Sequence, residues 1–437
     1  MSTTAKQSLF VFAHLDGEFV PAGKLDLIEQ GHQLIASTFA YGQRYIDRAN
    51  AIEIDPVGLS LSDKDKVRGK LLIPPNGLAF FGGLRDATPD AWGRRVIESR
   101  HKVPANSLAE STYLLEAGSD RIGALDVRMS LSAPPHATQG SIHSLAYLME
   151  AAERIELGLQ IPESLAAIFL AGSGLGGMRP KVSVRGDDEV LWLAKFSSQH
   201  DHQLNVPALE HAALKLAQLA GLNVPETRLV SIQNKQALLI RRFDRSYVDA
   251  GTLAHHHKEI RHPMISALTL LACDELDSPS KSYTDMVSAI RRHGATACIK
   301  ADIEELYARM IFNIMVSNDD DHLRNHAFLW DAALLGWRLS PLYDVMPRAT
   351  LASERFLHLG IGPKGRLATL DNAYASKERF GLSDADALRV IDRVCRIVRQ
   401  WRVTFESLAV PLRQMDLIAP AFRHIDDVSS PNLRQRL

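Results

Sequence analysis

The sequence predicts an α+β fold in which two strand-containing parts precede a mainly helical C-terminal part. The prediction rests on three changes of pattern along the 437 residues. Residues 9–131 mix alternating hydrophobic runs with helical stretches, and residues 181–243 contain three short β-type runs. From about Pro263 onward, apolar residues recur with the period of a helix. The length and the ordinary composition, 46% hydrophobic and 23% charged, suggest two or three globular domains.

The first part of the chain has the pattern of a small α+β unit. Hydrophobic residues alternate in LFVFAHLDGEFV (9–20) and GLAFFGGL (77–84), which is typical of strands. DAWGRRVIESRHK (90–102) instead has the spacing of a helix. SLSAPPHATQGS (130–141) is rich in Pro, Ser and Ala and indicates a linker or a long loop. We therefore expect an N-terminal subdomain over residues 1–130.

The second part, residues 131–437, starts with a helical segment and then turns to strands. SIHSLAYLMEAAERIELG (141–158) precedes a glycine-rich run, and the β-type runs are KVSVRG, EVLWLAKF and ALLIRRF. We expect these strands to lie in a smaller lobe at about 165–245. A helical lobe over about 246–437 follows, in which ELYARMIFNIMV (305–316) and ALRVIDRVCRIVRQWRVTFESL (387–408) are the clearest helices.

Charge and cysteine content exclude several classes of protein. A formal net charge of -1 gives no general attraction to nucleic acid or to an acidic membrane, so such contacts would need a local patch or a partner. The three cysteines are widely spaced and form neither a disulfide framework nor a cysteine zinc site. There is no apolar run of about 18 residues and no signal peptide, so we expect a soluble, cytoplasmic protein without a membrane partner.

An unusual cluster of charge occurs in SNDDDHLRNHAF, residues 317–328, at the end of a predicted helix. Three adjacent carboxylates repel one another unless they are solvated or are held by cations or hydrogen-bond donors. The run is therefore either a solvated turn or a metal or phosphate site, and the rest of the sequence has to distinguish the two.

A glycine-rich run, AGSGLGGMRPK, spans residues 171–181. Gly172, Gly174 and Gly177 fit the spacing GxGxxG, which lets backbone N–H groups approach a phosphate. The motif alone is weak evidence. No Gly-Lys-Ser/Thr follows, which excludes a Walker A loop, and a hairpin pattern in place of a helix disfavours a Rossmann loop. Candidate nucleotide-binding residues of this run are Gly172, Ser173, Gly174, Gly176, Gly177 and Lys181.

The hairpin that follows carries Lys195 in its second strand. A glycine loop, a strand and then a strand lysine is the order by which protein kinases cover ATP and pair its phosphates with a lysine. Lys195 could also be an ordinary surface lysine, although its apolar neighbours disfavour this. Glu210, on an amphipathic helix, is a candidate partner for Lys195 and could equally be one of many exposed glutamates.

Two further elements follow in the order of the kinase plan. Arg242, Phe243 and Asp244 come after a buried strand, where a hinge between two lobes would contact adenine through its backbone. In the kinase catalytic loop, the base aspartate precedes the metal-binding asparagine by five positions, and among the three aspartates only Asp320 has this distance from Asn325. GWRLSPLYDV is a predicted strand that ends near Asp344, where a second metal-binding aspartate is expected. Together these elements make a simple solvated turn an unlikely interpretation.

The same motifs carry a family resemblance. GSGLGGMRPK, LAKF, RRFDR, SNDDDHLRNHAF and LSPLYDV together resemble the HipA family of serine/threonine kinase toxins, and GSDRIGALDV (118–127) resembles the end of that family's N-terminal subdomain. The resemblance covers about residues 8–420 and implies a two-lobed, protein-kinase-like fold.

The resemblance also implies roles for individual residues. Lys195 would contact the ATP phosphates, Phe243 and its neighbours the adenine, and Asp320 would act as the catalytic base. Asn325 and Asp344 would hold Mg²⁺, and His322 would support the loop. Family members usually act with a small helix-turn-helix antitoxin (HipB-like) that binds operator DNA, and known substrates include aminoacyl-tRNA synthetases. Any contact with DNA would then be indirect.

One position departs from the family pattern. The family typically has two consecutive serines in the glycine run, and its regulatory phosphorylation falls on the second; here the pair is Ser173 and Gly174. We expect that this chain cannot inactivate itself at position 174 and that any autophosphorylation of the loop falls on Ser173. Two other functions stay open at this point: a nucleotide-binding pseudokinase that acts only as a corepressor, and a metal-dependent phosphohydrolase. The complete set of motifs disfavours both.

Overall fold

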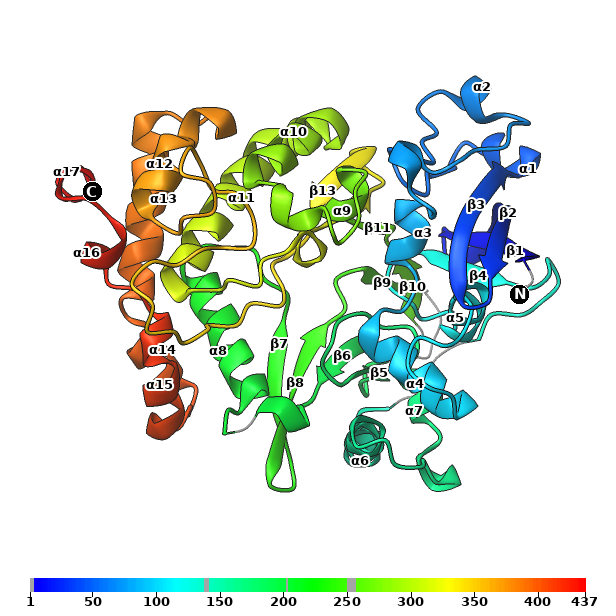
Figure 1. The fold of residues 1–437 in the computed structure, drawn as a ribbon, viewed down its shortest axis with the longest axis horizontal. Coiled ribbons are helices and arrows are strands. Elements are labelled where there is room, and N and C mark those ends of the chain that lie inside the picture. The colour runs from blue at the N-terminus through cyan, green and yellow to red at the C-terminus, as the bar shows by residue number, and fades with distance from the viewer. Residues whose placement is uncertain (1–3, 137–140, 202, 250–256) are drawn as a thin grey trace. The chain divides into compact units, whose positions relative to one another are not determined.

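The structure is a computed structural model that describes residues 4–136, 141–201, 203–249 and 257–437. The chain divides into two compact units. Unit 1 consists of Met1–His200 and Val230–Cys273, and unit 2 of Asp201–Leu229 and Asp274–Leu437. Unit 1 contains most of the strands, whereas unit 2 is mainly helical, as the sequence predicts (Figure 1).

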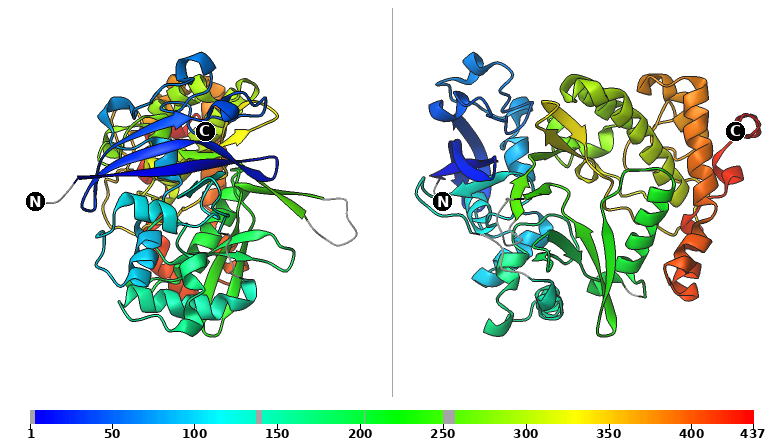
Figure 2. Two further views of the ribbon diagram at one scale, coloured as in Figure 1. Left: turned by 90° about the vertical axis from the view of Figure 1, so that its right-hand side faces the viewer. Right: turned by 180° about the vertical axis from the view of Figure 1, so that it is seen from behind.

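Unit 1 begins with a four-stranded antiparallel sheet in the order β3-β2-β1-β4. Its strands are β1 (Thr4–Leu15), β2 (Glu18–Gln30), β3 (Gln33–Tyr41) and β4 (Leu125–Arg128). Asp16 and Gly17 both have positive φ, 50° and 91°, which is the geometry that a tight two-residue hairpin turn requires. The predicted strand 9–20 is therefore a hairpin, and Figure 2 shows it in blue.

The helices of this first part are short and close one face of the sheet. They are α1 (Gln43–Ile46), α2 (Lys64–Val67), α3 (Gly82–Asp86), α4 (Ala91–His101) and α5 (Glu110–Glu116). Helix α4 confirms the prediction for residues 90–102. The strand predicted at residues 77–84 is wrong, because Gly82 and Gly83 lie inside α3. A Cβ on Gly83 would lie 2.6 Å from the carbonyl oxygen of Ile54, so these glycines serve close packing of the helix.

A second four-stranded sheet has the order β5-β6-β8-β7. It contains β5 (Lys181–Arg185), β6 (Leu191–Lys195), β7 (Thr227–Ile232) and β8 (Lys235–Arg241), and α6 (Leu145–Glu156) and α7 (Ile168–Ala171) precede it. Unit 1 ends with β9 (Arg245–Asp249), β10 (His257–Arg261), β11 (Met264–Ser266) and α9 (Ala267–Leu270). The predicted hairpin of residues 181–196 is confirmed.

Two separate hydrophobic cores lie within unit 1. The first is formed by residues between Leu9 and Val127, and the second by residues between Trp92 and Leu239. Helix α4 lies within the range of the first core in the sequence, but its residues Trp92 and Val96 belong to the second core. The expected domain boundary at residues 130 and 131 stays a prediction.

Unit 2 is built around the long helix α11 (Ile299–Val316), which is buried from Leu306 to Val316. Its other elements are α8 (Val206–Leu219), α10 (Tyr283–His293), β12 (Ala327–Asp331), β13 (Gly336–Leu339), α12 (Leu370–Ala375), α13 (Asp384–Val398), α14 (Trp401–Ser407), α15 (Leu412–Ile418), α16 (Ile425–Val428) and α17 (Pro431–Arg434). Helices α10 and α13 pack against α11 (Figure 1). A buried helix of this kind provides a rigid base for the loop that follows it.

Two predictions for unit 2 need correction. The single helix expected over residues 387–408 is two helices, because the chain turns at Arg399 and Gln400. The turn places Trp401 flat against Phe422, with ring centroids 4.0 Å apart. The strand expected to end near Asp344 ends earlier, at Leu339.

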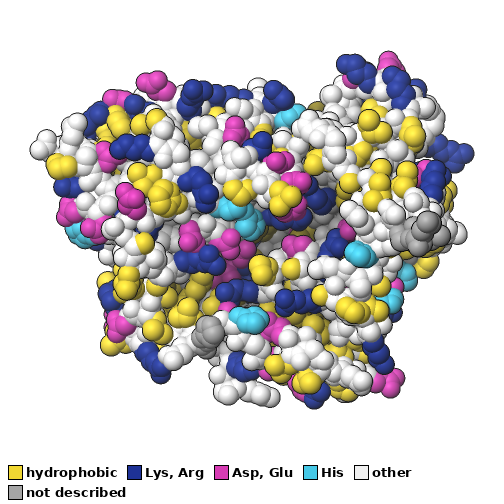
Figure 3. Space-filling model, in the orientation of Figure 1, with side chains coloured by type: hydrophobic (Ala, Val, Ile, Leu, Met, Phe, Trp, Pro, Cys, Tyr) yellow, Lys and Arg dark blue, Asp and Glu magenta, His cyan; other side chains and the backbone are white. Residues whose placement is uncertain are grey.

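The distribution of charge on the surface agrees with the composition of the sequence. Figure 3 shows acidic and basic side chains interspersed over the face in view, as expected for a net charge of -1. Among the residues that the structure describes, no helix combines the length and apolar character needed to cross a membrane.

Candidate functional site

The glycine-rich run lies in unit 1, where it links α7 to β5 and packs against helix α4. Gly177 has a φ of 89°, a conformation that favours glycine, and its carbonyl accepts a hydrogen bond from the backbone N–H of Trp92 at 2.9 Å. The indole N–H of Trp92 donates to the carbonyl of Lys181 at 2.7 Å. The N-terminal turn of α4 therefore holds both ends of the segment Gly177–Lys181.

The preceding residues of the run are packed even more closely. A Cβ on Gly174 would lie 2.6 Å from the carbonyl oxygen of Ala117, and the side chain of Ser173 is only 2% exposed. A Cβ on Gly176 would lie 3.0 Å from a carboxylate oxygen of Asp90. In this structure, the loop is seated on the N-terminal part of unit 1, and glycine at position 174 is what allows this contact.

Lys181 and Lys195 lie directly opposite each other in the β5–β6 hairpin. Directly paired residues of an antiparallel ladder project their side chains to the same face, and like charges in this position repel. Both lysines are buried, with exposures of 7% and 6%. The prediction that Lys195 is not an ordinary surface lysine is thus supported, and the pair provides positive charge next to the glycine run.

Arg242 and Asp244 were expected among the nucleotide-binding residues, but their side chains are buried inside unit 1 and bond to other groups there. The two form an ion pair at 2.6 Å, and Arg242 also donates to the carbonyl oxygens of Asp120 and Arg121. Asp244 further accepts from the backbone N–H of Gly123 at 2.8 Å. Burial opposes its charge, but the neighbouring arginines hold the pKa of Asp244 far below its usual range. The backbone N–H of Arg242 donates to Leu191 and the carbonyl of Asp244 accepts from His262, both at 3.0 Å, so Phe243 is the part of this segment that stays a candidate for contact with adenine.

In unit 2, helix α11 ends where the aspartate run begins. Ser317 adopts the left-handed conformation, with a φ of 51°, and ends the helix. Asp319 and Asp320 are exposed, with side-chain exposures of 46% and 57%. Arg348 lies 3.1 Å from a carboxylate oxygen of Asp319 and 4.0 Å from one of Asp320. The candidate base is therefore accessible to a large substrate.

Asn325 is held by its own loop. Its side-chain amide donates to the backbone carbonyl of Asp320 at 2.8 Å, so the spacing of five positions is closed by a hydrogen bond. The bond occupies the N–H₂ side of the amide and leaves its oxygen as an acceptor. His322 lies between Asp320 and Asn325 in the sequence, and its Nε2 is 4.0 Å from a carboxylate oxygen of Asp320.

Asp344 belongs to a loop and not to a strand. Its φ of 57° is unusual for a residue other than glycine, although Asp and Asn tolerate it better than most. The adjacent Tyr343 donates its hydroxyl to the carbonyl of Arg324 at 2.6 Å, which ties this loop to the aspartate–asparagine loop. Unit 2 thus brings together Asp320, His322, Asn325 and the segment of Asp344.

Glu210 lies on α8 in unit 2 and is buried, with an exposure of 4%. The prediction of an exposed helix glutamate is thereby excluded, whereas the pairing of Glu210 with Lys195 stays a prediction. Four side chains that the sequence analysis did not single out, Tyr283, Asn313, Asn318 and Tyr343, also contact the loops of the site. Tyr343 could have been suspected because it precedes Asp344.

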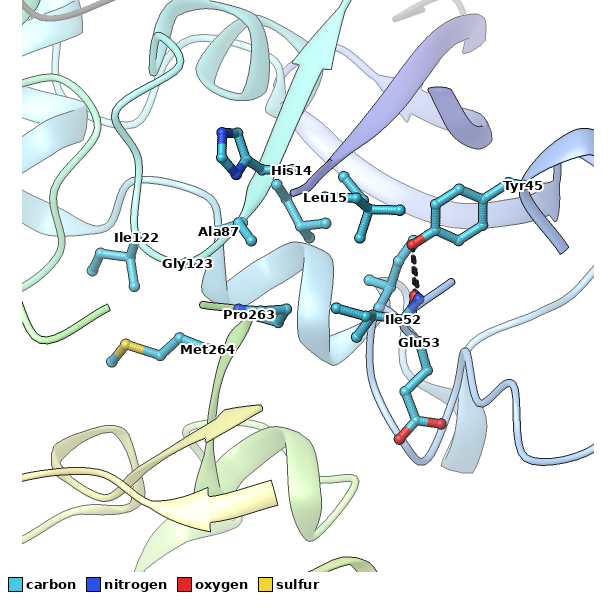
Figure 4. A pocket seen from close by; sticks show the side chains of 14 residues that line it. His14, Leu15, Tyr45, Ile52, Glu53, Ala87, Ile122, Gly123, Pro263 and Met264 are labelled. Carbon is cyan, nitrogen blue, oxygen red and sulfur yellow. Dashed lines mark hydrogen bonds between the residues drawn. The ribbon is translucent and has the colours of Figure 1, made fainter. Parts of the chain in front are cut away.

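A small cavity lies elsewhere in unit 1 (Figure 4). Its lining is mostly apolar and includes Leu15, Ile52, Ile122 and Met264, with His14 at one end. None of the predicted site residues contributes to it. The cavity therefore has no part in the candidate site.

The oxygen ligands of unit 2 suit a hard cation. Carboxylate and amide oxygens are the ligands that Mg²⁺ uses, usually one or two carboxylates together with phosphate oxygens. The side-chain oxygen of Asn325 and the carboxylate of Asp344 fit this chemistry, and no soft ligand lies among the predicted residues. In the described part of the chain, no group of three His, Cys, Asp or Glu side chains lies close enough together to hold a metal ion.

Comparison with known proteins identifies the family to which the chain is similar. The family model described as "HipA-like C-terminal domain" matches residues 173–401. The protein named "Putative kinase Y4dM" from Sinorhizobium fredii is 26% identical over 411 residues, 89% of each chain. "Putative kinase Y4mE" from the same organism is 28% identical over 348 residues, 76% of this chain and 77% of the relative.

A solved structure shows the same fold. A chain from the Shewanella oneidensis MR-1 complex of HipA, HipB and operator DNA superposes with a TM-score of 0.66 over 94% of both chains, at 15% identity. This likeness confirms the predicted α+β, HipA-like fold. Because the family model covers more than half of the 437 residues, the chain belongs to the HipA-like C-terminal domain family.

Proposed function

We propose that this protein is an ATP-dependent serine/threonine protein kinase of the HipA toxin type. The observation that carries the proposal is the hydrogen bond from the Asn325 side chain to the Asp320 carbonyl. It links the candidate base and the candidate metal ligand within one loop, which supports their proposed roles in phosphoryl transfer. The names of the two Sinorhizobium relatives support kinase activity.

The proposed mechanism assigns a role to each part. The glycine run and the lysines at 181 and 195 would bind the phosphates of ATP, and Asn325 and Asp344 would hold Mg²⁺. When bound, Mg²⁺ neutralises charge on the β- and γ-phosphates and orients them. Asp320 accepts the proton of a serine or threonine hydroxyl, whose oxygen forms the new bond to the γ-phosphorus. The bond from the γ-phosphorus to the bridging oxygen breaks, and ADP leaves with that oxygen.

The proposal includes a partner and a substrate class. The structural neighbour was solved with HipB and operator DNA, which supports a small, HipB-like DNA-binding antitoxin as the partner of this chain. Contact with DNA is then indirect, through that partner. The substrate is a cytoplasmic protein, and an aminoacyl-tRNA synthetase is the first to test.

The proposed function is tested with Asp320→Asn, which keeps the shape of the base and removes its basicity. Phosphate transfer from labelled ATP to protein should fall by at least about two orders of magnitude, the usual scale for a general base, while ATP binding stays nearly intact. The matched control is Asp319→Asn, because Asp319 is the adjacent, equally exposed aspartate. Full transfer by Asp320→Asn would reject the assignment.

The same assay separates the other two functions. Release of inorganic phosphate without any phosphorylated protein would indicate a phosphohydrolase. Binding of ATP without transfer by the unmodified protein, tested with candidate substrates, would indicate a pseudokinase that acts through its partner.

A further inference from the structure

The third aspartate of the run lies on the opposite side of the loop from the other two. Asp319 and Asp320 are exposed, whereas Asp321 is only 1% exposed. One carboxylate oxygen of Asp321 accepts a hydrogen bond from the hydroxyl of Tyr283 at 2.5 Å. The other accepts from the backbone N–H of His358 at 2.7 Å. The side chain therefore anchors the loop beneath Asp320 to two separate segments of unit 2.

Asp321 is the end of a chain of hydrogen bonds that all point toward it. The side-chain amide of Asn318 donates to the oxygen of Asn313 at 3.0 Å, and the amide of Asn313 donates to the hydroxyl of Tyr283 at 3.0 Å. Tyr283 in turn donates to Asp321. A carboxylate is an acceptor only, so its presence determines the direction of each bond before it. Bonds in such a chain also polarise one another.

The far end of this chain reaches the loop of the candidate metal ligand. The side-chain oxygen of Asn318 accepts from the backbone N–H of Met346 at 3.4 Å, two residues beyond Asp344. Tyr343 makes a second, independent link to the same loop through Arg324. The segment that carries Asp344 is thus attached at both sides to the loop that carries Asp320 and Asn325.

We propose that Asp321 is a positioning residue that sets the placement of the base loop relative to the loop of Asp344 through Tyr283, Asn313 and Asn318. The catalytic consequence rests on the proposed function, whereas the structural coupling does not. Asp321 itself contacts neither the nucleotide nor the hydroxyl, because its side chain faces the interior.

This position needs a hydrogen-bond acceptor and not only a side chain that fills the space. Burial raises the pKa of Asp321 to about 6, although the bonds from Tyr283 and His358 act in the opposite direction. Keeping a charged group in the interior is costly unless hydrogen-bond donors compensate it, and the hydroxyl of Tyr283 and the backbone N–H of His358 both donate to this one. An apolar side chain would fill the same space without this cost, but it would leave the hydroxyl of Tyr283 without its acceptor.

The experiment compares Asp321→Asn, Tyr283→Phe and the double variant with the unmodified protein. Asp416→Asn is the control, since it makes the same chemical change at an exposed aspartate of unit 2 that pairs with Arg402 at 3.1 Å. Hydrogen exchange is measured on peptides that cover residues 317–326 and 343–347, and phosphate transfer and ATP binding are measured in parallel. Tyr283→Phe keeps the aromatic ring and removes only the hydroxyl, so it decides the matter if Asp321→Asn does not fold.

The expected result is faster exchange in residues 343–347 of both single variants, although the change at Asp321 lies more than 20 positions away. Transfer should fall about 10- to 100-fold with ATP affinity changed less than about twofold, because small displacements of reacting groups have effects of this size. The double variant should be no worse than the more affected single variant, since both act through one chain of bonds. Asp416→Asn should behave like the unmodified protein in exchange.

Unchanged exchange in residues 343–347 in either single variant would overturn the proposed coupling, whatever the activity. Changed exchange with full transfer would limit Asp321 to a structural role and reject its effect on catalysis. If Asp320→Asn is active, the proposed function fails separately, and the exchange measurement still decides on the coupling.

Discussion

The side-chain amide of Asn325 donates to the backbone carbonyl of Asp320 at 2.8 Å. The bond closes the loop across the two residues that a phosphotransferase of this plan needs to keep at a fixed distance. It also selects which end of the Asn325 amide is available to a cation. The relationship is local, and the following predictions concern the residues around it and the parts of unit 1 that support the glycine run.

Asp344→Asn should weaken magnesium-dependent ATP binding. Asparagine tolerates the left-handed backbone at this position, so the change removes the charge of the ligand and leaves the loop conformation accessible. We expect the affinity for ATP in the presence of Mg²⁺ to fall by at least about tenfold, the lower end of the effect of losing even an outer-shell partner of a metal. Calorimetric titration with and without Mg²⁺ measures this, and an unchanged magnesium dependence would argue against Asp344 as a ligand.

Gly174→Ala should displace the glycine run from its seat. The new Cβ would lie 2.6 Å from the carbonyl oxygen of Ala117, and overpacking of this kind typically costs about 1–3 kcal/mol. Gly42→Ala is the control, because the nearest atom to its new Cβ is 3.6 Å away. Denaturant unfolding of both variants measures the difference. Equal stability would show that the contact with Ala117 is not retained in solution.

The same loop determines where autophosphorylation can occur. Position 174 has no hydroxyl, and Ser173 is 2% exposed in the seated loop. We expect any phosphate on this loop to appear only at Ser173 and to appear faster in Gly174→Ala, which exposes it. Incubation with ATP and Mg²⁺ followed by peptide mass spectrometry tests this. Phosphate on another residue, with activity over time unchanged by Ser173→Ala, would show that the loop serine has no regulatory role.

Asp244→Asn should strongly destabilise unit 1. Asp244 pairs with Arg242 at 2.6 Å and with Arg245 at 2.9 Å, and all three are buried. Removing one partner of a buried ion pair typically costs about 3–5 kcal/mol, because the other charges lose their compensation. Asp187→Asn, at an exposed aspartate paired with His143, should change the free energy of unfolding very little. Similar effects of the two substitutions would contradict a structural role for Asp244.

Acidification should destabilise the first sheet through His14. Burial, with Arg261 and Arg245 nearby, lowers the pKa of His14 to about 4 from an ordinary value of 6.5. Between these values the unfolded chain takes up a proton that the folded chain does not, so stability is complete above pH 6.5 and is lost as the pH falls toward 4. His14→Gln cannot be protonated and should lose less stability between pH 7 and pH 4.5. Parallel pH profiles of unfolding for the two proteins would disprove the assignment.

Sequence reasoning succeeded where the signal was local. The hairpin with Lys195 in its second strand follows from two alternating runs around a turn, and α11 follows from its apolar period. The distance of five positions between Asp320 and Asn325 was sufficient to choose the base among three identical residues, and its test remains the transfer assay. Local pattern also explains one error, since the apolar alternation around Gly82 and Gly83 resembles a strand although the two glycines belong to a helix.

Other features depended on partners far away in the sequence. Nothing in DDD distinguishes Asp321 from its neighbours, because its burial is determined by Tyr283, 38 positions earlier, and by His358. The interior role of Arg242 is similarly fixed by carbonyl groups about 120 positions earlier. Asp344 was expected at the end of a strand, but its left-handed backbone depends on the loop and not on its alternating neighbours.

The network around Asp244 also has a consequence for synthesis of the chain. The first core needs only residues between Leu9 and Val127, so it can form soon after they leave the ribosome. The ion pair of Asp120 with Arg261 and the hydrogen bond of Gly123 with Asp244 cannot form at that point, because these partners are translated more than 120 residues later. At about 5–20 residues per second, the delay is on the order of ten seconds. During that time the nascent protein carries a folded first sheet and an Asp120 carboxylate that has not yet met Arg261.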